Sequence, residues 1–209
     1  MTSRRQRVVV FISGGGSNMM SLLNATTDPS YPAEIVAVFS DKADAGGLAK
    51  AADRGIATFA FLRKDYDSKE AHEAAILAEL ERQAPDIICL AGYMRLLSGA
   101  FIGRYEGRIL NIHPSLLPLF PGLHTHQRAL DAGMRIAGCT VHYVTEGMDE
   151  GPIIAQAAVP VLPGDTADSL AARVLTVEHS TYPLALKLVA EGRVKMEDGR
   201  AVIEDPVAQ

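Results

Sequence analysis

The sequence has no tryptophan, only two cysteines, and no apolar run near the ~20 residues that cross a bilayer. Cys89 and Cys139 lie far apart in apolar runs and form no C-x-x-C pair, so we expect buried, reduced thiols. Positive charge is also scarce, since 25 acidic residues outnumber 20 basic ones and the formal net charge is -5. That balance disfavours a general nucleic-acid binder but allows a local basic pocket. We therefore expect small-molecule partners, no nucleic acid and no membrane.

The N-terminus is not expected to hold a secretory signal. Met1–Arg7 is basic, but the apolar run that follows extends only from Val8 to Ile12 and ends at Ser13-Gly-Gly-Gly16. This run is too short for the apolar region of a signal peptide. We expect a cytoplasmic protein.

Strand-like and helix-like segments alternate along the first two-thirds of the chain. A length of 209 residues suits a single domain over 1–209. Strands are predicted at Arg7–Ile12, Glu34–Phe39, Ile56–Phe61, Asp86–Leu90 and Arg108–Ile112. Helices are predicted to start at Asn18, to span Gly46–Arg54, to start near Ser68 as N-cap, and to follow His124.

The pattern changes toward the C-terminus. Gly138–Thr145 and Pro152–Val161 read as longer strands joined by a turn through Gly147–Gly151, followed by a helix over Thr166–Glu191 and a closing hairpin. Pro183 is expected to kink that helix. The whole predicts an α/β fold with an open, mostly parallel twisted sheet of Rossmann-like type and some antiparallel strands near the C-terminus.

Ser13–Asn18 joins a predicted strand to a helix through three glycines. Backbone N–H groups at a helix N-terminus attract anions, so a phosphate cradle is our preferred interpretation, with a plain connecting turn as the alternative. No Gly-Lys-Ser/Thr follows, so the loop is not a Walker A motif. Met19 stands where the dinucleotide fingerprint has its third glycine and where the nucleophile motif G-x-S-x-G has its last glycine, so neither of these motifs is complete.

A second polar pair, Asn111 and His113, ends another predicted strand and shares one face of it. An amide and an imidazole together can stabilise a developing oxyanion, although structural roles remain open. Asp149 would favour a charged His113 if its turn folded back onto that residue, which spacing alone cannot establish. His124 and His126 alternate, but this is a weak metal signal and we expect no metal.

These segments resemble the phosphoribosylglycinamide formyltransferase family, the folate-dependent glycinamide ribonucleotide transformylases of purine synthesis. The resemblance extends from Val8 to about Gly192. It rests on six segments: Ile12–Asn18 (ISGGGSN), Phe39–Ala45 (FSDKADA), Leu90–Leu97 (LAGYMRLL), Asn111–Pro118 (NIHPSLLP), Pro121–His126 (PGLHTH) and Met148–Pro152 (MDEGP).

The resemblance implies a formyltransferase fold and formyl transfer from 10-formyltetrahydrofolate, as co-substrate, to the glycyl amine of glycinamide ribonucleotide, without metal. It implies that Asn111, His113 and Asp149 are catalytic. Ribonucleotide contacts would come from Gly16, Ser17, Asn18 and Glu178, and folate contacts from Lys69, Met94, Arg95, Leu96, Leu97 and Asn111. The N-terminal half would hold the phosphate and the C-terminal half the folate. Leu119 stands where many relatives have a lysine, which would leave phosphate binding more to the backbone loop.

Several alternatives remain at this point. Formyltetrahydrofolate deformylase shares the Asn/His/Asp set but usually has an N-terminal regulatory domain, which we do not expect here because the first predicted strand begins at Arg7. Methionyl-tRNA formyltransferase would be longer and more basic. The incomplete glycine fingerprint disfavours a nucleotide-binding oxidoreductase. A non-catalytic nucleotide- or folate-binding protein would be expected to lack an intact Asn/His/Asp set. Either a monomer or a homodimer is compatible with the sequence.

Overall fold

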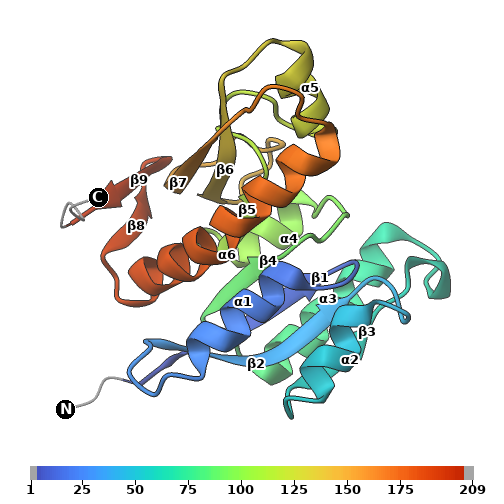
Figure 1. The fold of residues 1–209 in the computed structure, drawn as a ribbon. Helices are drawn as coiled ribbons and strands as arrows, with labels where there is room; N and C mark the ends of the chain where they lie inside the picture. Colours follow the sequence, from blue (N-terminus) through green and yellow to red (C-terminus); the bar gives the residue numbers. More distant parts are fainter. Residues whose placement is uncertain (1–3, 205–209) are drawn as a thin grey trace. The chain divides into compact units, whose positions relative to one another are not determined.

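The computed structural model describes residues 4–204, so the basic N-terminal stretch begins outside the described residues. The predicted alternation of strands and helices is confirmed, with ends that differ by a few residues (Figure 1). The strands are β1 (Gln6–Ile12), β2 (Ala33–Ser40), β3 (Ala57–Ala60), β4 (Ile87–Leu90), β5 (Ile109–His113), β6 (Ile136–Tyr143), β7 (Ile153–Pro160), β8 (Val194–Glu197) and β9 (Arg200–Ile203). The helices are α1 (Ser17–Thr26), α2 (Gly46–Ala52), α3 (Lys69–Gln83), α4 (Gly99–Arg104), α5 (Thr125–Asp131) and α6 (Ala167–Ala190).

The main sheet has seven strands in the order β3-β2-β1-β4-β5-β6-β7. β1 pairs in parallel with β2 and β4, β2 pairs in parallel with β3, and β6 pairs antiparallel with β7. The predicted mostly parallel sheet with antiparallel C-terminal strands is therefore confirmed. The chain divides into two compact units, the first ending at Leu110 and the second beginning at Asn111, inside β5. A single domain over residues 1–209 stays a prediction.

In the first unit, β1 forms the centre of the core. Residues Val8 to Ile12 are fully buried, because a parallel strand between two others is covered on both faces. The Phe11 ring packs against Phe39, Tyr93 and Phe101. β1, β2 and β4 are parallel, so the loops after Ile12, Ser40 and Leu90 leave the sheet at one edge. Ligands of open α/β sheets bind at that edge.

Two serine caps set helix starts in this unit. The hydroxyl of Ser68 accepts the N–H of Ala71 and begins α3, as predicted. Ser98 similarly accepts the N–H of Phe101 and begins α4, a short helix that the residue pattern did not predict. Ser98 also donates its backbone N–H, at 2.9 Å, to the carboxylate of Glu73 on α3. This bond ties Ser98, at the end of the loop between β4 and α4, to α3.

In the second unit, α6 covers the β6–β7 pair (Figure 1). Its buried face packs into a cluster with the two strands: Ala137, Cys139, Val159, Leu170 and Val174. The helix is continuous through Pro183, so the expected kink does not divide it. Cys89 and Cys139 are both buried and form no disulfide, as predicted, and burial raises the pKa of the Cys139 thiol to about 11.

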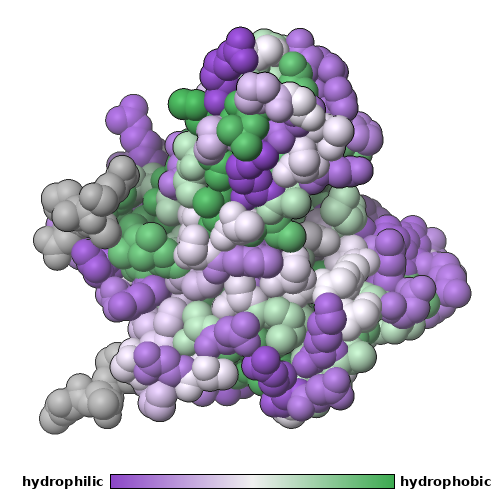
Figure 2. All heavy atoms as spheres, in the orientation of Figure 1, coloured by the Kyte–Doolittle hydropathy of each residue, from purple (hydrophilic) through white to green (hydrophobic). Residues whose placement is uncertain are grey.

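The predicted closing hairpin is present as β8 and β9, which form a separate two-stranded sheet. On the face drawn in Figure 2, hydrophobic residues gather beside this hairpin, where Val202 and Ile203 are partly exposed. Among residues 4–204, no helix has the length and apolar character that a membrane crossing requires.

Candidate active site

The glycine loop after β1 packs closely on the start of α2. Gly16 is the N-cap of α1, with a left-handed φ of 70° that favours glycine. A Cβ at Gly16 would lie 3.0 Å from the Cα of Gly47, and the N–H of Gly47 donates to the carbonyl of Gly14 at 3.0 Å. The Lys50 ammonium donates to the carbonyl of Gly15 at 2.8 Å. Two of the loop's carbonyls therefore bond to α2.

The same arrangement leaves a helix N-terminus suited to an anion. Gly16 has no side chain to cap α1, and the first turn of α1 contains no acidic residue. Ser17 is exposed, whereas Asn18 is buried. Unpaired N–H groups and the helix dipole attract phosphate or carboxylate at such a position.

A second set of predicted residues lines one cavity of about 320 Å³ in the first unit. Its walls include the predicted folate residues Lys69 and Met94 to Leu97, joined by Arg63, His72, Glu73 and Tyr93. Lys69 lies 3.7 Å from the Glu73 carboxylate, which also binds Ser98. Of the three cationic side chains in the lining, Lys69 faces Glu73 and Arg95 is paired with Asp41, so Arg63 leaves the balance at this cavity positive, which suits an anionic group.

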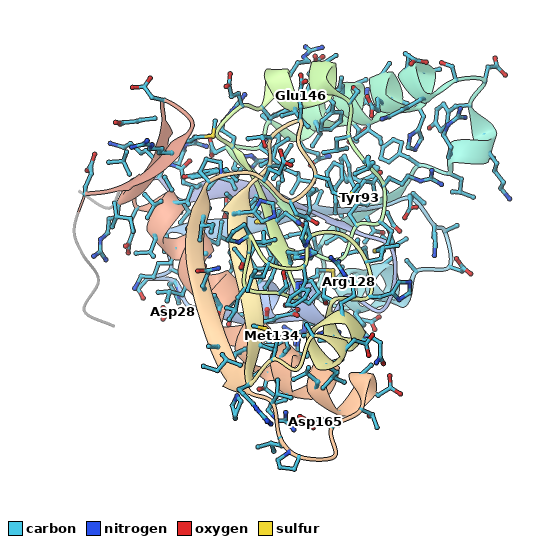
Figure 3. All side chains as sticks on the ribbon, turned by 90° about the horizontal axis from the view of Figure 1, so that it is seen from above. Asp28, Tyr93, Arg128, Met134, Glu146 and Asp165 are labelled. Atoms are coloured by element: carbon cyan, nitrogen blue, oxygen red, sulfur yellow. The ribbon has the colours of Figure 1, made fainter. Side chains whose placement is uncertain are left out.

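The loop after β4 is held from the end of β2. The buried carboxylate of Asp41 accepts from Arg95 Nε at 2.9 Å. Tyr93, labelled in Figure 3, packs edge-on against Phe11, and burial together with the Asp41 charge raises its pKa. The side chains of Met94 and Leu96 remain 64% and 65% exposed. The loop therefore has a fixed backbone and apolar side chains that are free to contact a ligand.

In the second unit, the structure brings Asn111, His113 and Asp149 together. His113 is buried at the end of β5, and its Nε2 lies 3.0 Å from the carbonyl of Phe120. Its Nδ1 lies 3.4 Å from Asp149 Oδ2. Both ring nitrogens thus face acceptors, which hold the ring in one orientation. The turn that carries Asp149 folds back onto His113, the contact that the sequence left open.

Asp149 is held by its backbone and by the segment before α5. It adopts a left-handed φ of 56°, which aspartate tolerates better than most residues. Its Oδ2 accepts the N–H of Gly122 at 2.8 Å. Arg128, labelled in Figure 3, donates to the carbonyl of Pro121 and stacks over the Phe120 ring. These contacts hold the Phe120 carbonyl and the Asp149 carboxylate, which are the two acceptors that face His113.

His142, which sequence analysis missed, completes this polar cluster. Its Nδ1 lies 2.9 Å from the carbonyl of Tyr143, so Nδ1 carries the proton and Nε2 can accept. Asn111 Nδ2 donates to that Nε2 at 3.2 Å, and Asp149 Oδ1 lies 3.9 Å away. Burial lowers the pKa of His142, which keeps its ring neutral near pH 7. The sequence feature that could have identified His142 is a histidine inside the apolar run of a buried strand.

The remaining predicted residues lie elsewhere in the second unit. Glu178 is buried on α6, near Cys139 of β6. Leu119 is half exposed. His124 caps α5, and burial, with the charge of His113, lowers the pKa of His126. Within residues 4–204, no group of three or more His, Cys, Asp or Glu side chains is arranged to hold a metal ion.

Comparisons with known proteins agree along the chain. The formyl transferase family model matches residues 6–186. The chain is 48% identical to phosphoribosylglycinamide formyltransferase of Escherichia coli (strain K12), covering 94% of this chain and 93% of that protein. A crystal structure of phosphoribosylglycinamide formyltransferase from Brucella melitensis matches with a TM-score of 0.87 and 75% identity, over 90% of this chain and 96% of that chain.

A more distant structure represents one of the alternatives. Formyltetrahydrofolate deformylase from Pseudomonas syringae pv. tomato str. DC3000 matches with a TM-score of 0.90 at 27% identity, over 98% of this chain and 67% of that chain. The phosphoribosylglycinamide formyltransferases are much more similar, at 48% and 75% identity, and each of these matches covers at least 90% of both chains compared. This chain belongs to the formyl transferase family and, within it, to the phosphoribosylglycinamide formyltransferases.

Proposed function

We propose that this chain transfers the formyl group of 10-formyltetrahydrofolate to the glycyl amine of glycinamide ribonucleotide in purine biosynthesis. The observation that carries the proposal is the buried cluster in which Asp149 faces His113 at 3.4 Å while Asn111 bonds to His142. Acyl transfer to an amine needs donors for an oxyanion, and this cluster supplies an amide and an imidazole held by a carboxylate.

The first unit would supply most of the substrate contacts. Gly16, Ser17 and Asn18 would bind the ribonucleotide phosphate at the N-terminus of α1, and Glu178 of the second unit would bind another part of the ribonucleotide. Lys69 and Met94 to Leu97 would bind the folate, with Asn111 also in contact. The cationic cavity supports this assignment because the glutamate tail of a folate is anionic.

The reaction follows from the contacts of the cluster. The substrate amine attacks the formyl carbon, and the carbonyl oxygen becomes an oxyanion that accepts from Asn111 Nδ2 and from the ring of His113. The Phe120 carbonyl and the Asp149 carboxylate hold that ring in place. The attacking nitrogen then loses a proton, the folate nitrogen gains one, and the bond between formyl carbon and folate nitrogen breaks. No covalent enzyme intermediate and no metal take part.

Neutral His142 has a separate role in this mechanism. Because its Nε2 accepts from Asn111, it sets which way the amide of Asn111 points. One N–H of the amide is used in this bond, and the other remains for the oxyanion. We further propose a cytoplasmic enzyme that acts as a monomer or homodimer.

The direct test of the function is release of tetrahydrofolate, followed by its ultraviolet absorbance, when the protein is mixed with 10-formyltetrahydrofolate. We expect release that depends on added glycinamide ribonucleotide, with one formylated ribonucleotide formed per tetrahydrofolate. Release without ribonucleotide would identify a deformylase instead. Binding of either ligand with no release would favour a non-catalytic binding protein.

Gly16→Ala tests the phosphate site. The added Cβ meets Gly47, and the left-handed φ costs about 1–2 kcal/mol, so the loop must shift. We expect KM for the ribonucleotide to rise much more than KM for the folate. Gly55→Ala is the control, because Gly55 has a similar φ of 74° with open space around it. Its melting temperature should fall through the backbone cost alone, with unchanged KM values. Equal KM effects for both substrates in Gly16→Ala would contradict the assignment.

Asp149→Asn tests the electrostatic role of the carboxylate. Asparagine keeps the shape and tolerates the left-handed backbone but removes the negative charge that faces His113. We expect kcat to fall by roughly 10²–10⁴. Glu150→Gln removes a charge from the same turn and should leave kcat unchanged. A wild-type kcat in Asp149→Asn would exclude this role.

A further inference from the structure

Ser13 stands where the hydrogen-bond ladder between β1 and β4 ends. The carbonyl of Phe11 accepts the N–H of Ala91 at 2.8 Å, and the N–H of Ser13 donates to the carbonyl of Gly92 at 3.2 Å. In the register that pairs Phe11 with Leu90, a regular parallel ladder would continue with Ser13 donating to the carbonyl of Ala91 and the N–H of Tyr93 donating to the carbonyl of Ser13. Instead, the bond from Ser13 is shifted by one residue to Gly92, and the N–H of Met94 donates to the hydroxyl Oγ of Ser13 at 2.9 Å. The side-chain oxygen takes the place of the backbone carbonyl as acceptor.

This replacement lets one residue serve two loops. Because the hydroxyl extends the ladder, the main chain of Ser13 is free to turn away from the sheet into the glycine loop. Ser13 is only 4% exposed, so water does not compete for its two bonds to the loop after β4. The next residue of that loop, Arg95, is held by Asp41. The backbone at Met94 and Arg95 is thus fixed from the ends of β1 and β2.

We propose that Ser13 is a positioning residue that couples the two substrate loops of the first unit. The inference rests on the proposed function, which gives the glycine loop to the ribonucleotide phosphate and the loop after β4 to the folate. Phosphate bound at the N–H groups of α1 adds contacts to the glycine loop and so further stabilises the position of Ser13. Because Ser13 holds the N–H of Met94, the same contacts favour the conformation of the loop after β4 that the folate binds. Coupling of this kind is reciprocal between the two ligands.

The test is a binding cycle measured by calorimetry, with tetrahydrofolate as probe and glycinamide ribonucleotide present or absent. In the wild-type protein we expect the ribonucleotide to tighten tetrahydrofolate binding about fivefold or more. Ser13→Ala removes the acceptor and should reduce this factor to near one. A wild-type protein without coupling, or a Ser13→Ala protein with the full factor, would overturn the inference.

Controls separate coupling from a loss of stability. Thr26→Ala removes another buried hydroxyl of the same unit, which bonds only locally to the carbonyl of Leu23 at 3.0 Å, and should keep the full factor. Threonine and valine have the same shape, but only threonine has a hydroxyl. Ser13→Thr should therefore retain coupling and Ser13→Val should lose it; equal factors in both would also overturn the inference.

Wild-type turnover distinguishes the two proposals. Active wild-type protein with unchanged coupling in Ser13→Ala contradicts this inference alone, whereas inactive wild-type protein contradicts the proposed function.

Discussion

A carboxylate that is nearly buried needs partners, and the second unit is arranged around those of Asp149. One oxygen binds the Gly122 N–H and faces His113, and the other faces His142. Burial without such contacts would neutralise the carboxylate. The two histidines differ because of their other contacts. His142 is deeply buried and its lowered pKa keeps it neutral, whereas His113 has acceptors at both nitrogens. The cluster thus combines a neutral imidazole that orients Asn111 with a second imidazole that faces the carboxylate.

The first unit depends on backbone geometry more than on charge. Its loops leave the sheet at the ends of parallel strands, and each is fixed by a few bonds to a neighbour: Gly14 and Gly15 to α2, Met94 to Ser13, and Arg95 to Asp41. Each bond contributes little by itself, on the order of 1 kcal/mol. Together they hold the N-terminus of α1 and the loop after β4 in defined conformations without filling the space that a substrate would occupy.

Sequence periodicity was sufficient for the sheet because buried parallel strands are continuous apolar runs, as in Val8–Ile12 and Asp86–Leu90. It also placed Asn111 and His113 on one face. It could not place Asp149, because a turn between strands has no period that fixes where it folds. His142 was missed because its strand was assigned from its apolar neighbours, and α4 because a helix of six residues has too few turns for a pattern. The role of Ser13 depends on a side chain that replaces a carbonyl, which no residue pattern encodes.

The central claim is that neutral His142 orients Asn111 inside the cluster. Nitrogen-15 NMR of the histidine rings tests it most directly, since the chemical shifts distinguish the two neutral tautomers from the imidazolium. The account predicts that near pH 7 His142 is neutral with its proton on Nδ1, toward the Tyr143 carbonyl, and that it titrates below the usual histidine pKa of about 6.5. A proton on Nε2, or a charged ring near pH 7, would leave Asn111 without its acceptor and would contradict the account.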